Sequence, residues 1–105
     1  MKNSILLTYP AIFTQEDNQY WVEFIDLKGC YSDGNSLAEA MEHAKEAMGL
    51  FLEDLTEYPK CTTDFSNIKL EKNQIISYVE INLEEHKKKY EKKSVPNMDR
   101  IKMVN

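Results

Sequence analysis

Glycine, proline and cysteine are scarce in this chain, with three, three and two residues among 105. So little glycine and proline excludes collagen-like and low-complexity material and favours an ordered domain. Cys30 and Cys61 have neither CxxC spacing nor neighbouring histidine ligands, which argues against a zinc or redox site. We therefore expect two free thiols in a reducing compartment.

The N-terminus also lacks a long apolar run, because Ile5, Leu6 and Leu7 are soon followed by Pro10. A secretory signal needs about 7–15 apolar residues and a membrane span about 20. With 42% hydrophobic residues, the chain can still bury the modest core of one domain. We expect a soluble, cytoplasmic protein with no membrane partner.

Basic residues are the minority: 13 lysines and arginines stand against 18 acidic residues, a net charge of −5. This balance argues against a constitutive nucleic-acid binder, whose surface normally carries a basic excess. The charge is also uneven, since residues 1–82 hold 14 acidic and 6 basic side chains, net −8, and residues 83–105 hold 4 and 7, net +3. The acidic body favours a basic partner and repels phosphate, and the basic tail leaves non-specific nucleic-acid contact as an alternative.

Alternating apolar residues predict three antiparallel strands in the first third of the chain. The first covers residues 4–14, the second covers 19–25 after a polar turn, and the third covers 30–32. Pro10 has no N–H to donate, which predicts that the first strand lies at a sheet edge or carries a bulge. In the second strand, the alternation puts Trp21 on the face opposite the apolar positions that would be buried.

A capping box predicts where a long helix begins. The Ser36 hydroxyl would accept from the N–H of Glu39, and the Glu39 carboxylate would accept from the N–H of Ser36. An apolar stripe at three- and four-residue spacing continues the helix to Leu55 for about five turns, and Pro59 ends it. Gly49 lies inside this helix, where it costs up to about 1 kcal/mol relative to alanine. A close packing contact with the sheet would explain this glycine.

The remaining chain predicts one more strand and one more helix. A loop over residues 56–74 leads to a strand at 75–81, and Asn82 caps a charged helix from residue 83 to about 93. The fold class is therefore α+β: a three-stranded antiparallel meander, a long helix on one sheet face, a further strand and a short C-terminal helix.

This architecture predicts one domain with an exposed sheet face. We place the domain in residues 1–83, and a basic helix and tail with no complete second domain in residues 84–105. One helix covers only one face of the sheet, so Ile12, Trp21 and Tyr31 are left on the other face. An apolar second face usually marks a partner or self-association surface, so we expect a homodimer or a higher homo-oligomer.

Catalytic and metal-binding patterns are missing, so we expect no enzyme activity, no metal site and no cofactor. Two-metal cleavage needs several carboxylates converging on central strands, but Glu23, Asp26 and Glu80 are scattered along the sequence. His43 and His86 lie among charged helical residues without a nearby nucleophile, so both are expected at the surface. No GxGxxG or P-loop pattern is present.

The stretch from Tyr9 to Leu55 resembles the HicB-type antitoxins of bacterial toxin–antitoxin modules. The matching elements are a hydrophobic first strand, a D-L-x-G-C turn that starts at Asp26, a later glycine, and a helix that opens with S-L-A-E-A. Single elements of this kind are weak signals, and the ordered set is more specific. The motif residues are Gly29, Cys30, Gly34, Ser36 and Glu39.

The resemblance implies a partial RNase H-like fold and a role in protein binding. The partner would be a small basic HicA-type toxin that cleaves mRNA, and the antitoxin would neutralise it by occlusion. The acidic body of this chain suits such a partner. The candidate partner-binding residues lie at or near the strand turns: Glu16, Asp17, Trp21, Glu23, Asp26 and Asp33.

Two other functions stay open. One is an orphan homo-oligomeric module that binds a small ligand or another protein. The other is a transcriptional autorepressor acting through the basic tail, because many members of the family carry a C-terminal helix-turn-helix or ribbon-helix-helix domain. Only twelve residues follow Lys93, too few for either unit, so DNA binding by this chain alone is not expected.

Overall fold

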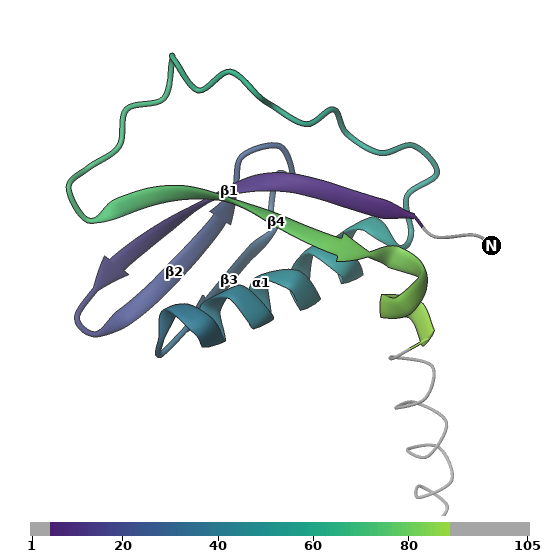
Figure 1. Cartoon of the computed structure of the whole chain (residues 1–105), viewed down its shortest axis with the longest axis horizontal. Coiled ribbons are helices and arrows are strands. Elements are labelled where there is room, and N and C mark those ends of the chain that lie inside the picture. Colours follow the sequence, from purple (N-terminus) through teal and green to yellow (C-terminus); the bar gives the residue numbers. More distant parts are fainter. Residues whose placement is uncertain (1–4, 89–105) are drawn as a thin grey trace, which may run out of the picture.

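The computed structural model of the protein describes residues 5–88 and shows a four-stranded antiparallel sheet with a long helix on one face (Figure 1). The strand order is β3-β2-β1-β4, so the first and last strands of the chain are neighbours. A short helix over residues 83–88 follows the last strand. The predicted α+β class and element order are confirmed. The elements are β1 (Leu6–Glu16), β2 (Gln19–Phe24), β3 (Tyr31–Gly34), α1 (Leu37–Leu52) and β4 (Gln74–Asn82).

Pro10 lies within β1, a central strand, so the prediction of an edge strand or a bulge is wrong. The register of β1 with both neighbours is unbroken, and Pro10 is opposite Tyr78 of β4. The carbonyl of Pro10 accepts from the N–H of Ile25, 3.1 Å away and just beyond the end of β2. The N and C=O of a strand residue point to the same side. The missing N–H of Pro10 therefore faces the place where β2 leaves the sheet, and the β1–β4 ladder loses no donor.

Ser36 caps the N-terminus of α1, where its Oγ accepts from the N–H of Glu39 at 3.0 Å. The Glu39 carboxylate accepts from the N–H of Asn35 at 2.6 Å, and not from Ser36 as predicted. Gly34 lies directly before this turn, and a Cβ there would come within 3 Å of backbone atoms of Ala40. The start of the helix therefore packs too closely on the end of β3 for any residue except glycine.

The C-terminal end of α1 is at Leu52, before the end at Leu55 that the apolar stripe predicts. Pro59 consequently does not terminate the helix. Its carbonyl instead accepts from the Tyr9 hydroxyl at 2.5 Å, which fixes the segment after α1 to β1. Burial is the largest cause that raises the pKa of Tyr9, which keeps the hydroxyl protonated as a donor.

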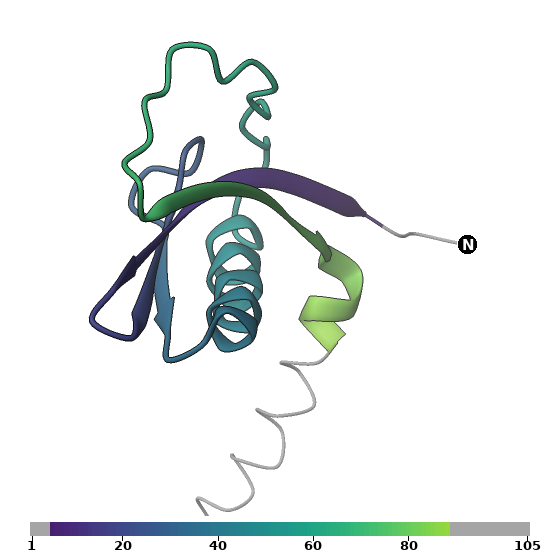
Figure 2. The ribbon, with the colours of Figure 1, turned by 60° about the vertical axis from the view of Figure 1, so that its left-hand side comes forward.

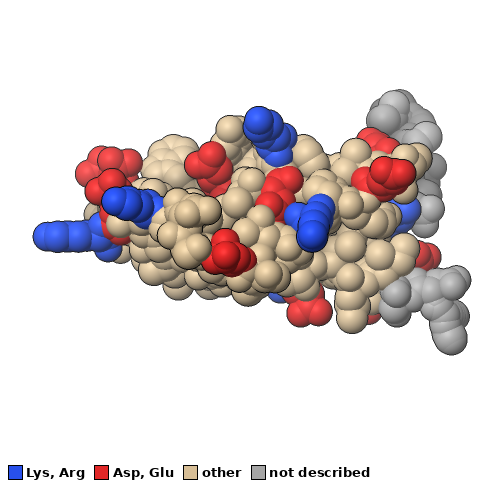
Figure 3. Space-filling view, turned by 90° about the horizontal axis from the view of Figure 1, so that it is seen from above, with Lys and Arg blue, Asp and Glu red and all other residues tan. Residues whose placement is uncertain are grey.

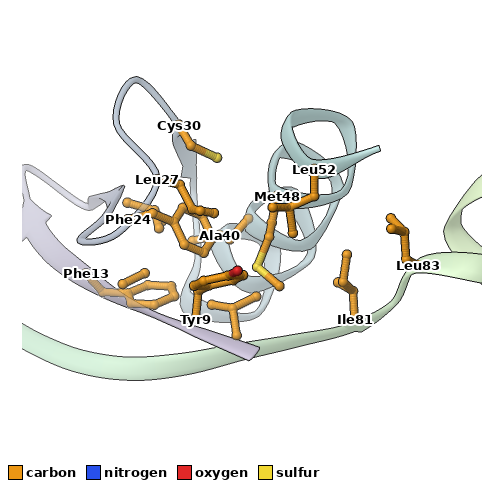
Figure 4. Packing of buried hydrophobic residues seen from close by; sticks show 14 residues of the cluster. Tyr9, Phe13, Phe24, Leu27, Cys30, Ala40, Met48, Leu52, Ile81 and Leu83 are labelled. Carbon is orange, nitrogen blue, oxygen red and sulfur yellow. The ribbon is translucent and has the colours of Figure 1, made fainter. Parts of the chain in front are cut away.

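The core lies between α1 and the sheet face turned toward it (Figure 4). Alternate residues of the strands are buried there, and α1 contributes small side chains that bring the helix close to the strands. Burial of a large apolar side chain stabilises a fold by about 1.5–3 kcal/mol. The core comprises Tyr9, Ala11, Phe13, Val22, Phe24, Leu27, Cys30, Ala40, Ala44, Met48, Leu52, Val79, Ile81 and Leu83.

The part of the chain that the structure describes has no helix long and apolar enough to cross a membrane.

The short helix at residues 83–88 begins with the predicted cap, because Asn82 Oδ1 accepts from the N–H of Glu85 at 3.1 Å. Figure 2 shows this helix turning from the end of β4 toward the side of α1. Residues 89–93 of the predicted helix lie outside the described residues.

His86 holds this short helix against α1. Its side chain is buried, so the expectation of a surface histidine is wrong. The imidazole lies over Gly49, and its Nε2 is 3.6 Å from Glu53 Oε1, an ion pair when the ring is protonated. Contact with His86, and not with the sheet, therefore explains the glycine inside α1.

Replacing Gly49 by alanine tests this contact. The new Cβ would lie within 3 Å of the His86 ring, and overpacking typically costs about 1–3 kcal/mol, more than the roughly 1 kcal/mol that alanine gains in a helix. We expect G49A to lower the free energy of unfolding in urea, with Leu50→Ala on the exposed side of α1 as control. In a His86→Ala background the same change should become stabilising. A gain in stability with His86 present would contradict the packing argument.

Cys30 offers a test of burial by chemistry. Its thiol is buried, and burial raises its pKa from 9.0 to about 11. The native state therefore keeps the thiol neutral, so this contribution to stability is present below pH 9.0 and is lost as the pH rises toward about 11. At pH 8, we expect iodoacetamide to label the half-buried Cys61 faster than Cys30, and both equally in urea, as measured by mass spectrometry. Equal native rates would show that Cys30 is accessible.

Candidate interaction surface

The sheet face turned away from α1 carries side chains from three strands in register. Directly opposite residues of antiparallel strands have Cβ atoms about 4.5–5.5 Å apart. Side chains of neighbouring strands therefore touch across this face. Two adjacent cross-strand rows run over it, Asp33–Trp21–Thr14 and Tyr31–Glu23–Ile12.

A shallow hollow of about 220 Å³ opens on these rows. The two aromatic residues are largely exposed, with 47% of Trp21 and 62% of Tyr31 accessible to solvent. Large exposed aromatic side chains are a common sign of a protein interface. We define the β2–β3 surface as Ile12, Trp21, Glu23, Tyr31 and Asp33.

Two of the predicted acids lie near this surface, at the hairpin between β1 and β2. Asp17 and Asn18 form the turn with φ angles of 53° and 63°, as in a two-residue type I′ hairpin. Glu16 is opposite Gln19, so it shares the sheet face of Trp21. The structure thus brings Glu16 to the rim of the β2–β3 surface and leaves Asp17 at the hairpin tip.

Asp26 is separated from the other predicted acids and is used within the chain. Its carboxylate accepts from the N–H of Thr62 at 2.8 Å and from the Thr62 hydroxyl at 2.5 Å. This contact ties the segment between α1 and β4 to the end of β2. Asp26 therefore anchors the segment that contains Thr62.

The same segment, residues 53–73, passes over part of the sheet face away from α1 (Figure 1). The Phe65 and Tyr78 rings lie 5.8 Å apart, and Pro10 beneath this region is fully buried. The expectation that the whole second face is uncovered is therefore wrong at this end. Seen from the side of this segment, acidic and basic side chains are scattered with uncharged surface between them (Figure 3).

His43 is also tied to the edge of the sheet. Its Nδ1 lies 2.7 Å from the backbone oxygen of Asp33, and the ring is half-buried. His43 therefore lies partly at the surface, and its ring also links α1 to β3. This contact uses the backbone oxygen of Asp33, so the Asp33 carboxylate remains part of the β2–β3 surface.

Tyr31 and Ile12 are missing from the predicted partner-binding set, although the structure places both beside Glu23. The signal that finds them is the strand alternation, which assigns both to the face opposite the core. Among residues 5–88, no three His, Cys, Asp or Glu side chains come close enough together to hold a metal ion. The surface therefore offers contact chemistry: aromatic rings, aliphatic area and carboxylates.

A family model described as the HicB-like antitoxin of bacterial toxin–antitoxin systems matches residues 9–102. The chain belongs to the HicB-like antitoxin family. The resemblance carried by the D-L-x-G-C turn and the helix start is thereby confirmed.

Two curated proteins are similar to this HicB-like chain. An uncharacterized 14.9 kDa protein from the rep-hol intergenic region of Haemophilus phage HP1 is 34% identical over 83 residues, which cover 73% of this chain and 62% of the phage protein. The chain thus spans less than two thirds of that relative's length. A UPF0150 protein of Helicobacter pylori is 35% identical over 71 residues, covering 68% of this chain and 90% of that protein.

Two solved structures share the fold. A chain of a toxin–antitoxin complex from Streptococcus pneumoniae superposes with a TM-score of 0.68 at 25% identity, covering 78% of this chain and 73% of that chain. A chain of the HicA3 and HicB3 toxin–antitoxin complex gives a TM-score of 0.55 at 22% identity, with 69% and 94% covered. Both neighbours are thus components of toxin–antitoxin complexes.

Substituting Asp26 tests its anchoring role. D26A removes both acceptors of Thr62 and leaves a part-buried N–H and hydroxyl without them. We expect the free energy of unfolding to fall by about 1–3 kcal/mol, because unsatisfied polar groups cost this much. Asp33→Ala is the matched control, since its backbone oxygen keeps the His43 contact. Equal stability of both variants in urea denaturation would contradict the anchoring role.

Proposed function

We propose that this HicB-like chain is the antitoxin of a type II module, and that it binds and neutralises a small basic HicA-type mRNA-cleaving toxin by occlusion. The observation that carries the proposal is the β2–β3 surface, where Trp21 and Tyr31 stand exposed beside the carboxylates of Glu23 and Asp33. Family membership supports the same role.

The chemistry of this surface suits a basic partner. Trp and Tyr are enriched among the residues that dominate binding free energy, because they bury large area at low entropic cost. Carboxylates around them would pair with lysine and arginine and steer association. A body with a net charge of −8 over residues 1–82 would also repel RNA from a bound toxin. Occlusion of this kind needs no catalytic group, cofactor or metal from the antitoxin.

Several finer features remain predictions. The toxin's identity as a HicA-type protein and the cytoplasm as the place of action follow from the proposed role. A homodimer is the commonest assembly for such a domain. The division of the chain at residues 83 and 84, and the lack of DNA binding by the tail, also remain predictions.

Alanine substitutions on the β2–β3 surface test the proposal. We expect W21A and Y31A each to weaken binding of a small basic HicA-type toxin at least about 30-fold, which corresponds to roughly 2 kcal/mol, the usual threshold of a hot spot. Isothermal titration calorimetry measures the affinity, and co-expression measures rescue of growth. Leu50→Ala is the control, since Leu50 is similarly exposed but lies on α1.

Circular dichroism and urea denaturation should show that W21A and Y31A fold normally, because neither side chain belongs to the core. Absence of any complex between the wild-type chain and that basic protein would overturn the antitoxin assignment. Binding that survives both substitutions unchanged would keep the partner and move the interface elsewhere.

A further inference from the structure

Among residues 5–88, no strand pairs with the outer edge of β4. β4 pairs with β1 on its other side, and hydrogen bonds from the N–H of Gln15 to the carbonyl of Asn73 and from the N–H of Leu83 to the carbonyl of Ile5 continue that ladder at both ends. Odd-numbered residues therefore point their N–H and C=O groups toward β1, since both groups of a strand residue lie on one side. The even-numbered residues of β4 point theirs away from the sheet.

These outward groups are open to a new partner. Within residues 5–88, no backbone acceptor engages the N–H groups of Ile76, Tyr78 or Glu80. The N–H of Gln74, in contrast, is bonded to the carbonyl of Glu71. A weak contact of 3.3 Å from the Ser77 hydroxyl reaches the Tyr78 carbonyl. β4 thus presents a nine-residue edge without proline or lysine, the kind of edge that pairs with another strand.

The opposite edge of the sheet is protected in the usual ways. β3 has only four residues, and His43 lies against the outward carbonyl of Asp33. Short length and a covering side chain are common means of blocking an edge. Of the two edges, β4 is therefore the better site for pairing with an added strand.

Beneath the β4 edge lies an acidic groove of about 290 Å³, formed between β4, α1 and the short C-terminal helix. Among the described residues that line it, Lys45 is the one lysine and lies 3.8 Å from Glu42, so within residues 5–88 no lysine of the lining pairs with the other carboxylates. The groove is lined by Glu42, Lys45, Glu46, Glu80, Ile81, Asn82, Glu85 and His86.

We propose that the β4 edge and this groove bind an extended, basic segment of the toxin by strand addition, which would extend the sheet by one strand. The inference rests on the antitoxin role proposed above. Unpaired backbone groups select an extended segment, and alternating side chains in pockets give specificity. Side chains on the α1 side of the added strand would meet Glu46 and Glu85, so lysine or arginine fits there. Side chains on the other face would lie beside Ile76 and Tyr78, so apolar residues fit there.

Charge argues for this occupant over a second copy of the chain. Two β4 edges paired with each other would bring together two bodies that each carry a net charge of −8 over residues 1–82, and would leave both acidic grooves without basic partners. A basic segment instead neutralises the groove while its backbone satisfies the edge. The segment expected from the partner therefore alternates basic and apolar residues.

Amide hydrogen exchange by NMR reads out the added strand residue by residue. In the free chain, the outward amides of Ile76, Tyr78 and Glu80 should exchange fast, while those of Ser77 and Val79 are protected by β1. On binding a small basic HicA-type toxin, we expect exchange of the outward amides to slow at least tenfold, with little change at the inward ones. Unchanged exchange at the outward amides in a complex that does form would overturn the inference and leave the antitoxin role intact.

Two kinds of variant test the edge and the groove separately. Ile76→Pro removes an outward N–H and no ladder donor, and edge strands tolerate proline at such positions. Glu46→Lys with Glu85→Lys reverses the groove charge, and Glu57→Lys with Glu71→Lys is the control with the same charge change at exposed sites outside the groove. We expect the proline variant and the groove pair each to weaken toxin binding at least tenfold, and the control pair by less than threefold. If both charge-reversal pairs weakened toxin binding equally, the effect would come from overall charge and not from the groove. That result would overturn the groove's part in the inference.

The same exchange experiment on the chain alone distinguishes other occupants. Protection of the outward amides that grows with concentration of the chain would assign the edge to a second copy. Protection at all concentrations that disappears in Arg100→Glu with Lys102→Glu would assign it to the chain's own basic residues. Either result would show that the β4 edge is not the binding site of a toxin segment, and would overturn the inference. A wild-type chain that forms no complex with the basic protein removes the antitoxin role itself.

Discussion

β1 is hydrogen-bonded along both of its edges, and the rest of the molecule is built around this one strand. It pairs with β2 through a tight hairpin and with β4 across more than fifty intervening residues. One face of the resulting sheet supports α1 and the core. Because β1 is central, the two edges of the described sheet are β3 and β4. β3 has four residues and His43 lies against it, whereas β4 has nine residues. The position of β1 thus defines every surface on which a partner could bind.

The two faces of the sheet serve different purposes: one is buried in the core and the other is partly exposed. The α1 face is closed by apolar packing, whereas the opposite face is divided between the 53–73 segment and the β2–β3 surface. The segment is held by side-chain contacts of Tyr9 and Asp26 with Pro59 and Thr62. These contacts keep the segment over one end of the sheet and away from the exposed Trp21. A loop anchor and an interaction surface therefore share a face without competing for it.

Local signals predicted most of the fold, and long-range contacts account for what they missed. Strand alternation placed Trp21 and Glu23 away from the core, and the Ser36 cap located the start of α1. The tolerance of Pro10 in a central strand depends on where β2 ends, which no pattern within β1 reveals. Burial of His86 depends on Gly49, thirty-seven residues earlier in the chain. The charge of Asp26 is visible in the sequence, but its hydrogen bonds to Thr62, thirty-six residues later, are not.

The strand order has a consequence for how the chain acquires its shape during synthesis. β1, β2, β3 and α1 are contiguous in sequence, but β4 is not complete until Asn82 has been made. Until then the far edge of β1 has no partner and the core lacks Val79 and Ile81. Closing a long loop costs little more than closing a short one at equilibrium, but non-local pairing is slow. A nascent or cleaved chain that ends before β4 therefore leaves the far edge of the central strand unpaired and the core incomplete.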